Sequence, residues 1–372
     1  MSADPSDFTL QPLSFAELSG WSEDDPTSLL APMGACLRHV TAVKPYRTGS
    51  LGLSTADLLP LLEAASHAFP RSAQEARRFF EAHCTPFRIA RRDGHAGFVT
   101  AFYEPEVAVS ERREGEWRHP FYRRPHDLAD IDDGNRPPGL DASYAFALAG
   151  PDGFSAYADR QAIDRGHLTG RGLEIAWAKS KIDVFFAHVQ GAARLRYENG
   201  SVRRITYAAK AGHPFSAIGR LLIDRGEIDA RDISMQAIRA WLAAHLEQMD
   251  EVMWHNRSYI FFREAEVDDL SAGPIAAAKV PLVAGRSLAV DRMIHTFGFP
   301  FFIRSENLAH LDGGKPFARL MLALDTGTAI VGQARGDIFS GSGDVAGELA
   351  GTGRNAADSY ILIPNAAAAR FR

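Results

Sequence analysis

The sequence predicts a mainly β protein with peripheral helices. From Ser258 onward, short β-branched and aromatic runs alternate with glycine-rich turns, which is typical of barrels and sandwiches. Helical apolar spacing is concentrated in the first hundred residues and in about 214–249, so the regular alternation of a doubly wound sheet is missing. A chain of 372 residues is long enough for two or three domains.

The composition is that of a globular chain, with 46% hydrophobic and 23% charged residues. A formal charge of −5 offers no overall positive field, so we expect no nucleic-acid partner. Gly, Pro or charge interrupts every apolar run before the roughly 18 residues that a membrane helix needs. The first residues contain neither a basic segment nor an apolar run, so they do not resemble a secretory signal.

The first elements are predicted from local signals. Ser72-Ala-Gln-Glu75 has the spacing of a capping box and predicts a helix over about 72–83. The run Phe98–Glu104 is aromatic and β-branched and ends at Pro105, which predicts a strand. Asp130–Asp141 has the glycine and proline content of a loop.

The middle of the chain mixes both kinds of element. Lys181–Gln190 is interpreted as a β-rich segment. Leu195–Val202 contains an Asn-Gly pair between residues suited to strands and predicts a hairpin. Pro214–Arg225 and Ser234–Met249 carry apolar residues at helical spacing and predict two helices. The strands predicted after Ser258 are Tyr259–Arg263, Leu288–Val290, Arg319–Leu324, Ala329–Val331, Asp337–Phe339 and Tyr360–Ile363.

Familiar catalytic motifs are weak or missing. Gly341-Ser-Gly-Asp-Val-Ala346 matches a dinucleotide-binding pattern, but no βαβ unit surrounds it. Two cysteines, Cys36 and Cys84, can form one bridge or remain two thiols, and both alternatives stay open. The 13 histidines show no spacing that would hold a metal ion, so we expect no metal and no cofactor.

Three aspartates carry the best chemical signal. Asp325 and Asp337 stand near the ends of apolar strands beside glycines, and Asp291 ends the run Arg286-Ser-Leu-Ala-Val-Asp291. A carboxyl group in such a place can be partly desolvated, which raises its pKa toward the range useful for proton donation. The alternative is that each aspartate only caps a turn.

Short matches spread from about residue 98 to 364 resemble the family of membrane-bound lytic murein transglycosylase A, whose members cleave bacterial peptidoglycan and carry a carboxyl-terminal domain named for three aspartates. The matching segments occur in the family's order. They are Phe102–Pro105, Phe121–Pro125, Leu173–Trp177, Phe185–Phe186, Val189–Gly191, Ile218–Arg220, Ser258–Arg263, Gly285–Asp291 and Asp325–Asp337.

The resemblance implies a double-psi β-barrel with an inserted second β domain and a substrate groove between them. The barrel domain would comprise residues 1–105 together with 255–372, including the N-terminal helices, and the substrate-binding insert residues 106–254. It also implies that Asp337 is the single catalytic acid and base, with Asp325 and Asp291 in supporting roles. The residues implied to bind substrate are Thr100, Tyr103, Glu104, Arg123, Gln190, Gly191, Tyr259 and Phe262.

One carboxyl group is enough for the implied reaction. In a lytic transglycosylase the 6-hydroxyl of N-acetylmuramic acid attacks its own anomeric carbon, so no second carboxylate has to activate water. The products carry 1,6-anhydromuramoyl ends. We therefore expect a monomer that acts on peptidoglycan glycan strands, in the periplasm or at the outer membrane, with its leader absent from the sequence given.

Departures from the usual family pattern bear on substrate preference, among them Ala101, Ala192, Ala193, Ala211, Phe215 and Thr296. Two rival functions remain. One is a hydrolase that uses Asp325 or Glu104 to activate water. The other is a glycan-binding module without turnover.

Overall fold

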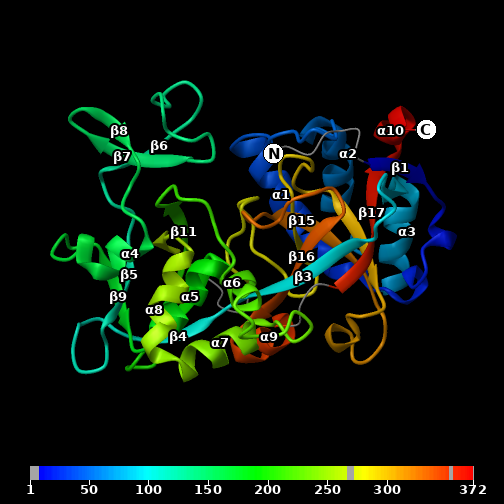
Figure 1. Cartoon of the computed structure of the whole chain (residues 1–372). Coiled ribbons are helices and arrows are strands. Elements are labelled where there is room, and N and C mark those ends of the chain that lie inside the picture. The colour runs from blue at the N-terminus through cyan, green and yellow to red at the C-terminus, as the bar shows by residue number, and fades with distance from the viewer. Residues whose placement is uncertain (1–7, 266–271, 352–354, 372) are drawn as a thin grey trace. The chain divides into compact units, whose positions relative to one another are not determined.

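The structure is a computed structural model that describes residues 8–265, 272–351 and 355–371. The chain divides into two compact units, each with cores of its own (Figure 1). Unit 1 consists of Met1–Tyr103, Leu270–Gly341 and Thr352–Arg372. Unit 2 consists of Glu104–Asp269 and Ser342–Gly351.

Unit 1 is built around a closed barrel. Its sheet has the order β1-β2-β17-β14-β15-β13-β16-β3, and β3 also pairs with β17, so six strands from β17 to β3 form a ring. Strands β1 and β2 extend the sheet beyond that ring. The strands are β1 (Phe8–Pro12), β2 (Cys84–Arg91), β3 (Gly97–Glu104), β13 (Ser287–Val290), β14 (Pro300–Ser305), β15 (Phe317–Asp325), β16 (Arg335–Ser342) and β17 (Asn355–Pro364).

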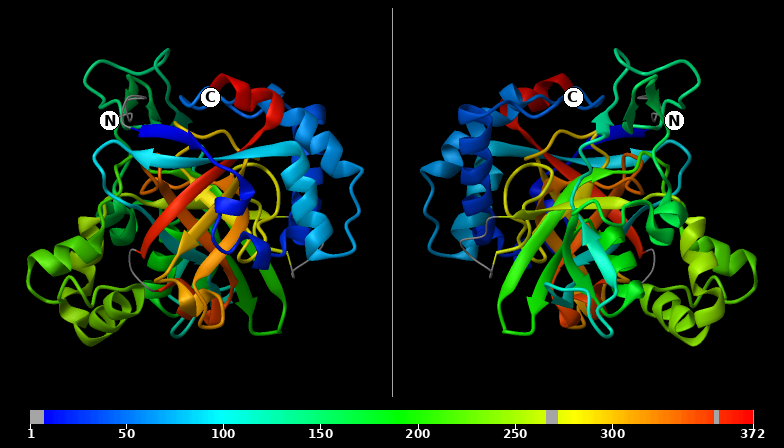
Figure 2. Two further views of the ribbon diagram at one scale, coloured as in Figure 1. Left: turned by 90° about the vertical axis from the view of Figure 1, so that its right-hand side faces the viewer. Right: turned by 90° about the vertical axis from the view of Figure 1, so that its left-hand side faces the viewer.

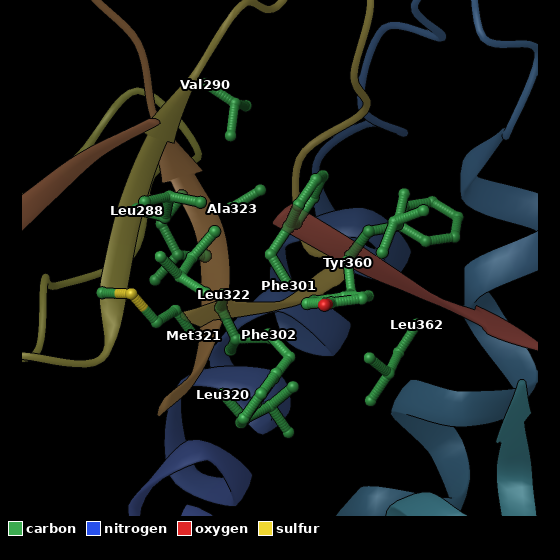
Figure 3. Packing of buried hydrophobic residues seen from close by; sticks show 14 of the residues in the cluster. Leu288, Val290, Phe301, Phe302, Leu320, Met321, Leu322, Ala323, Tyr360 and Leu362 are labelled. Carbon is green, nitrogen blue, oxygen red and sulfur yellow. The ribbon is translucent and has the colours of Figure 1, made fainter. Parts of the chain in front are cut away.

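The core of unit 1 explains why some of its strands are apolar on both faces. Leu320, Leu322 and Leu324 alternate along β15 with Met321 and Ala323, and all five are buried. A strand with both faces covered has a continuous apolar run instead of an alternating one. Figure 3 shows how the β15 residues 320–323 pack with side chains from β13, β14 and β17, among them Leu288, Phe302 and Leu362.

Helices pack on one side of this barrel (Figure 2). The helices of unit 1 are α1 (Leu30–Ala42), α2 (Thr55–Ser66), α3 (Ala73–His83) and α10 (Asn365–Ala368). The predicted helix over 72–83 is confirmed as α3, because the Ser72 side chain caps it by accepting the Glu75 N–H at 3.2 Å. Helix α3 buries Ala76 and Phe80, and Phe80 packs in the barrel core.

Unit 2 contains a six-stranded sheet and a separate three-stranded sheet. The larger sheet has the order β12-β11-β10-β4-β9-β5, and a bridge between Arg123 and Phe262 connects its two edge strands. Its strands are β4 (Glu106–Ser110), β5 (His119–Tyr122), β9 (Glu174–Ala178), β10 (Ala192–Tyr197), β11 (Val202–Lys210) and β12 (Ile260–Ala265). The smaller sheet consists of β6 (Leu128–Asp130), β7 (Phe146–Gly150) and β8 (Gly153–Ser155).

The helices of unit 2 are α4 (Arg160–Ala162), α5 (Lys181–Gln190), α6 (Ile218–Asp224), α7 (Met235–Ala244), α8 (Leu246–His255) and α9 (Asp344–Ala350). Helices α5 to α8 bury one apolar cluster that includes Phe185, Leu222, Trp241 and Met253. None of the helices in the described ranges is both long enough and apolar enough to cross a membrane.

The β interpretation of Lys181–Gln190 is wrong, because this segment is helix α5. Ser180 caps its start by accepting the Asp183 N–H at 3.1 Å, and Gly191 ends it with a positive φ of 78°. Of the aromatic and β-branched residues that suggested a strand, Val184, Phe185 and Phe186 are buried on the inner face of the helix. The capping residues were visible in the sequence and outweigh the β propensity of the interior.

Other predicted elements are confirmed or adjusted. The hairpin around Asn199-Gly200 is confirmed as the antiparallel pair β10 and β11. The helix predicted over Ser234–Met249 is interrupted at His245, where the backbone leaves helical values between α7 and α8. The strand predicted at Ala329–Val331 is wrong, because those residues lie in the loop before β16. Strands β1 and β2 lie in a region that the sequence indicated as helical.

Candidate active site

Two of the three aspartates lie in one row across the barrel sheet. Strand β13 runs between β15 and β16, and its residue Ala289 is the register partner of Asp325 on one side and of Asp337 on the other. Register partners on neighbouring strands place their side chains on the same face of the sheet. The structure therefore brings Asp325 and Asp337 to one face, with one small alanine between them.

Gly336 allows strand β16 to pack closely at this point. A Cβ atom added at Gly336 would lie 2.8 Å from Leu288 Cδ1 and 3.3 Å from Val99 Cγ1. Because successive residues of a strand point to opposite faces, Gly336 faces the packed core and Asp337 faces away from it. Close packing against Leu288 and Val99 therefore requires a glycine at position 336, independently of the role of Asp337.

Thr100 of β3 contacts Asp337 directly. The Thr100 hydroxyl donates a hydrogen bond to Oδ1 of Asp337, and Arg335 Nη2 donates to the Thr100 Oγ1 at 2.6 Å. Arg335 is itself buried and its guanidinium lies over the Phe98 ring at 4.8 Å. Thr100, expected to bind substrate, is therefore engaged with the predicted catalytic carboxyl group.

Burial raises the pKa of Asp337, because removal from water disfavours its charged form. The nearby positive charge of Arg335 and the hydrogen bond from Thr100 act in the opposite direction on this pKa. The residue is only partly buried, so a ligand can reach it from outside. Its raised pKa means that the carboxyl group stays protonated to a higher pH than an exposed aspartate does. These are the properties that a general acid requires.

Asp325 is a second carboxyl group with a raised pKa. Burial raises its pKa to about 6, and the negative charge of Asp337 adds to that effect. The backbone N–H of Ala277, which donates to Oδ1 at 3.1 Å, and the charge of Lys279 oppose it. Asp325 is thus electrostatically coupled to Asp337 and held in place by the loop before β13.

Asp291 has a different setting, because both of its carboxylate oxygens accept backbone hydrogen bonds. Met293 N–H donates to Oδ1 at 2.9 Å, and Gly332 N–H donates to Oδ2 at 2.9 Å. The neighbouring His295 ring contacts the Gln333 carbonyl at 2.8 Å through Nε2. Asp291 and His295 therefore fasten the turn after β13 to the loop before β16, the strand that carries Asp337.

Glu104 and Tyr103 are buried at the end of β3. The Glu104 carboxylate accepts two bonds from Arg204 at 2.5 and 2.9 Å, one from Arg194 Nε at 3.0 Å and one from the Ser342 hydroxyl at 2.7 Å. Its side chain has no exposed surface. A carboxylate so occupied has no free oxygen to activate water, so Glu104 is the centre of a buried ion cluster.

Three predicted binding residues lie at the surface of unit 2. Arg123 donates to the Glu174 carbonyl at 2.7 Å and to Glu264 at 2.6 Å, and its side chain is 46% exposed. Gln190 is the last residue of α5, and Gly191 is the C-cap of that helix. The left-handed backbone of Gly191 is reason enough for a glycine there.

The two aromatic residues predicted to bind glycan are core residues in the structure. Tyr259 is 2% exposed and Phe262 is 1% exposed. Tyr259 packs in the cluster with Phe261 and Leu168, and Phe262 packs in the cluster with Phe121 and Leu195. Stacking on a sugar ring needs an exposed ring face, so burial gives both rings a structural role.

Sequence reasoning missed Arg335. Its signal was the spacing to Asp337, because residues two apart in a strand share one face.

Among residues 8–265, 272–351 and 355–371, no group of three His, Cys, Asp or Glu side chains is arranged to hold a metal ion. Cys36 and Cys84 are both buried free thiols.

Comparisons with known proteins agree on one family. Residues 98–263 match the MltA specific insert domain, and residues 286–363 match the 3D domain. The structure of a membrane-bound lytic murein transglycosylase from Agrobacterium tumefaciens is 62% identical, with a TM-score of 0.94, and the match covers 98% of this chain and 100% of that one. MltA from Neisseria gonorrhoeae is 29% identical, with a TM-score of 0.78, and the match covers 98% of this chain and 95% of that one.

Membrane-bound lytic murein transglycosylase A of Escherichia coli K12 is 34% identical over 257 residues, which are 68% of this chain and 61% of that protein. The matched region thus spans less than two thirds of that curated relative. The structure of E. coli MltA with bound chitohexaose is 25% identical, with a TM-score of 0.68, and the match covers 96% of this chain and 94% of that one. The chain belongs to the family of membrane-bound lytic murein transglycosylase A, as the resemblance predicted.

Proposed function

We propose that this chain is a peptidoglycan lytic transglycosylase that uses Asp337 as its single acid and base. The reaction cleaves the β-1,4 bond from N-acetylmuramic acid to N-acetylglucosamine and leaves 1,6-anhydromuramoyl ends. The observation that carries the proposal is the setting of Asp337. It is a partly buried carboxyl group with a raised pKa, held by Thr100, in a chain of this family.

The reaction proceeds in two proton transfers. Protonated Asp337 gives its proton to the bridging oxygen while the bond from that oxygen to the anomeric carbon breaks. The 6-hydroxyl oxygen of the same muramic residue then forms a bond to the anomeric carbon, and its proton goes to Asp337. No water is consumed, and Asp337 ends in the protonated form in which it began.

Asp325 and Asp291 support this chemistry in different ways. Asp325 faces the same side of the sheet as Asp337, and the negative charge of Asp337 raises its pKa, so Asp325 stays protonated next to the ionised Asp337 that forms after the first proton transfer. Asp291 holds the loop that precedes β16. The contacts of Glu104 disfavour the rival in which Glu104 activates water, whereas Asp325 remains a candidate base for hydrolysis.

The substrate assignment rests on relatives. One is named a murein transglycosylase, and E. coli MltA was solved with chitohexaose. We propose peptidoglycan glycan strands as substrate, and residues 106–254 as an insert that binds them through groups such as Arg123, Gln190 and Gly191. A double-psi connection in the barrel, a groove between the domains and a monomeric state stay predictions. Because peptidoglycan lies outside the cytoplasmic membrane, we place the protein in the cell envelope.

Digestion of purified sacculi tests the proposal directly. Mass spectrometry of the released fragments should show anhydromuramoyl ends, which are lighter by one water than the reducing ends of a hydrolase. Fragments with reducing ends alone would favour hydrolysis with Asp325 as base. Sacculi that bind the protein without any release of fragments would favour a glycan-binding module.

A further inference from the structure

The contact between Arg335 and Thr100 gives Thr100 a defined hydrogen-bond direction. A guanidinium group can only donate hydrogen bonds, so Thr100 Oγ1 must accept the bond from Arg335 Nη2. A threonine hydroxyl has a single proton to donate. In the described part of the chain, its other hydrogen-bond partner is Oδ1 of Asp337, so the hydroxyl proton points to that oxygen.

We infer that Arg335 is a positioning residue, which acts through Thr100 to reserve Oδ1 of Asp337 as an acceptor and to leave Oδ2 as the oxygen that gives and takes the proton. If Oδ1 carried the proton instead, the Thr100 hydroxyl would have to donate to the oxygen of another O–H group, which is a weaker acceptor than a carbonyl or carboxylate oxygen. The inference rests on the proposed function, because it assigns an atom to the acid that the proposal names.

The geometry also explains why Arg335 is kept buried next to an acid. Its guanidinium donates to the Gly336 carbonyl and lies over the Phe98 ring, so three contacts from β3 and β16 hold the group. A planar group held on several sides keeps one orientation. The Thr100 hydroxyl therefore meets the same donor whether Asp337 is protonated or ionised.

Strands β16 and β15 bring charged or titratable side chains close to Asp337 in the described part of the chain. Strand β16 contributes Arg335, and β15 contributes Asp325, which has Lys279 near it. Strand β3 contributes the uncharged hydroxyl of Thr100, and β13 contributes Ala289. Arg335 and Thr100 lower the pKa of Asp337 against the effect of burial, so removal of either should raise it.

The test measures the pH at which Asp337 loses its proton, first by NMR in the absence of substrate and then through the pH dependence of turnover. In the full chain carrying ¹³C-labelled aspartate, the Asp337 carboxyl signal is assigned by its loss in Asp337→Asn and is then titrated by NMR. Arg335→Met should move its midpoint to higher pH, and Arg335→Lys, which keeps a charged donor, should leave it close to the parent value. Arg304→Met, which removes an arginine from β14 that pairs with Glu306, is the matched control and should cause no shift.

Thr100 variants test whether Arg335 acts on Asp337 through the Thr100 hydroxyl, which we call the relay, or only through its positive charge. Thr100→Val should raise the midpoint, Thr100→Ser should preserve it, and Arg335→Met should add less in the Thr100→Val background than in the parent. The alkaline limb of kcat/KM on sacculi should follow the same order. An unchanged midpoint in Arg335→Met, or equal shifts in the Met and Lys variants, would overturn the inference.

The two proposals fail in different ways. The NMR titration reports on Arg335 and Thr100 even in a protein that releases no fragments. The proposed function would instead be contradicted if the Asp337→Asn variant kept full activity on sacculi. If Arg335→Met does not fold, the Thr100 pair still decides, because a midpoint that is equal in Thr100→Val and Thr100→Ser contradicts the relay.

Discussion

Asp291 accepts the backbone N–H of Gly332 at 2.9 Å, across 41 residues of sequence. This bond joins the turn after β13 to the loop that leads into β16, and Asp337 is the third residue of β16. The support of the candidate acid is therefore a contact between two loops, made by another aspartate of the same domain.

Replacement of Asp291 should weaken this support. Asp291→Ala leaves the N–H groups of Met293 and Gly332 without their acceptors, at a cost of about 1–3 kcal/mol for each buried group that stays unsatisfied. We expect a lower melting temperature and a lower kcat on sacculi. Asp358→Ala, which removes an acid that is 35% exposed and pairs with Arg88, is the control and should change the melting temperature little.

Asp337→Asn should abolish most turnover while the fold persists. General acid and base catalysis contributes roughly 10²–10⁴-fold to a rate, so release of soluble fragments should fall by at least about 100-fold. Circular dichroism and the melting temperature should stay near the parent values, because asparagine has almost the same shape. A variant that clears sacculi as fast as the parent would contradict the assignment of Asp337.

The pH dependence of stability should reveal Asp325. Its folded pKa is raised to about 6, so between its unfolded pKa and about 6 the native state binds more protons than the unfolded state. Its contribution to the unfolding free energy is therefore present at low pH and is lost as pH rises through about 6. The expected loss is on the order of 3 kcal/mol.

The measurement is a comparison of Asp325→Asn with the parent by chemical unfolding at several pH values. The variant cannot ionise at this position, so its stability relative to the parent should improve between pH 4 and pH 7. A constant difference across that range would show that the carboxyl group is not desolvated in the folded protein.

Glu104→Gln should be one of the most damaging single changes in unit 2. It leaves the buried guanidinium of Arg204 and the adjacent Arg194 without a counter-charge, which costs about 3–5 kcal/mol for a buried pair. Glu106→Gln is the matched control two residues away, where the partner Arg196 is 51% exposed, and should cost less than about 1 kcal/mol. Equal losses in the two variants would mean that burial does not set the strength of these pairs.

Both cysteines should resist alkylation in the folded protein. Burial raises the pKa of Cys36 to about 11 and that of Cys84 further, so neither thiol ionises readily at neutral pH. Iodoacetamide should add two groups only after denaturation, as read by intact mass. If denatured, unreduced protein takes up no reagent and has a mass two daltons lower than after reduction, the thiols are bridged.

Local signals were enough for the elements that depend on neighbours in sequence. Ser72 predicted helix α3, and the Asn199-Gly200 pair predicted the hairpin of β10 and β11, because a cap or a tight turn involves only a few adjacent residues. The segment Lys181–Gln190 shows the limit of such signals. Its interior favours a strand, but the capping groups at its ends make it a helix.

The sequence by itself determined the residue types at the candidate site and, through the resemblance, the family and the prediction that Asp337 is the acid. Only the tertiary structure decided what each of these residues contacts. Thr100 and Asp337 are 237 positions apart, and β13 has to lie between β15 and β16 before Asp325 and Asp337 share a face. Burial is likewise a property of the packed chain. The same stretch of strand β3 therefore carries Thr100 as a partner of the candidate acid and Glu104 as the centre of a closed ion cluster.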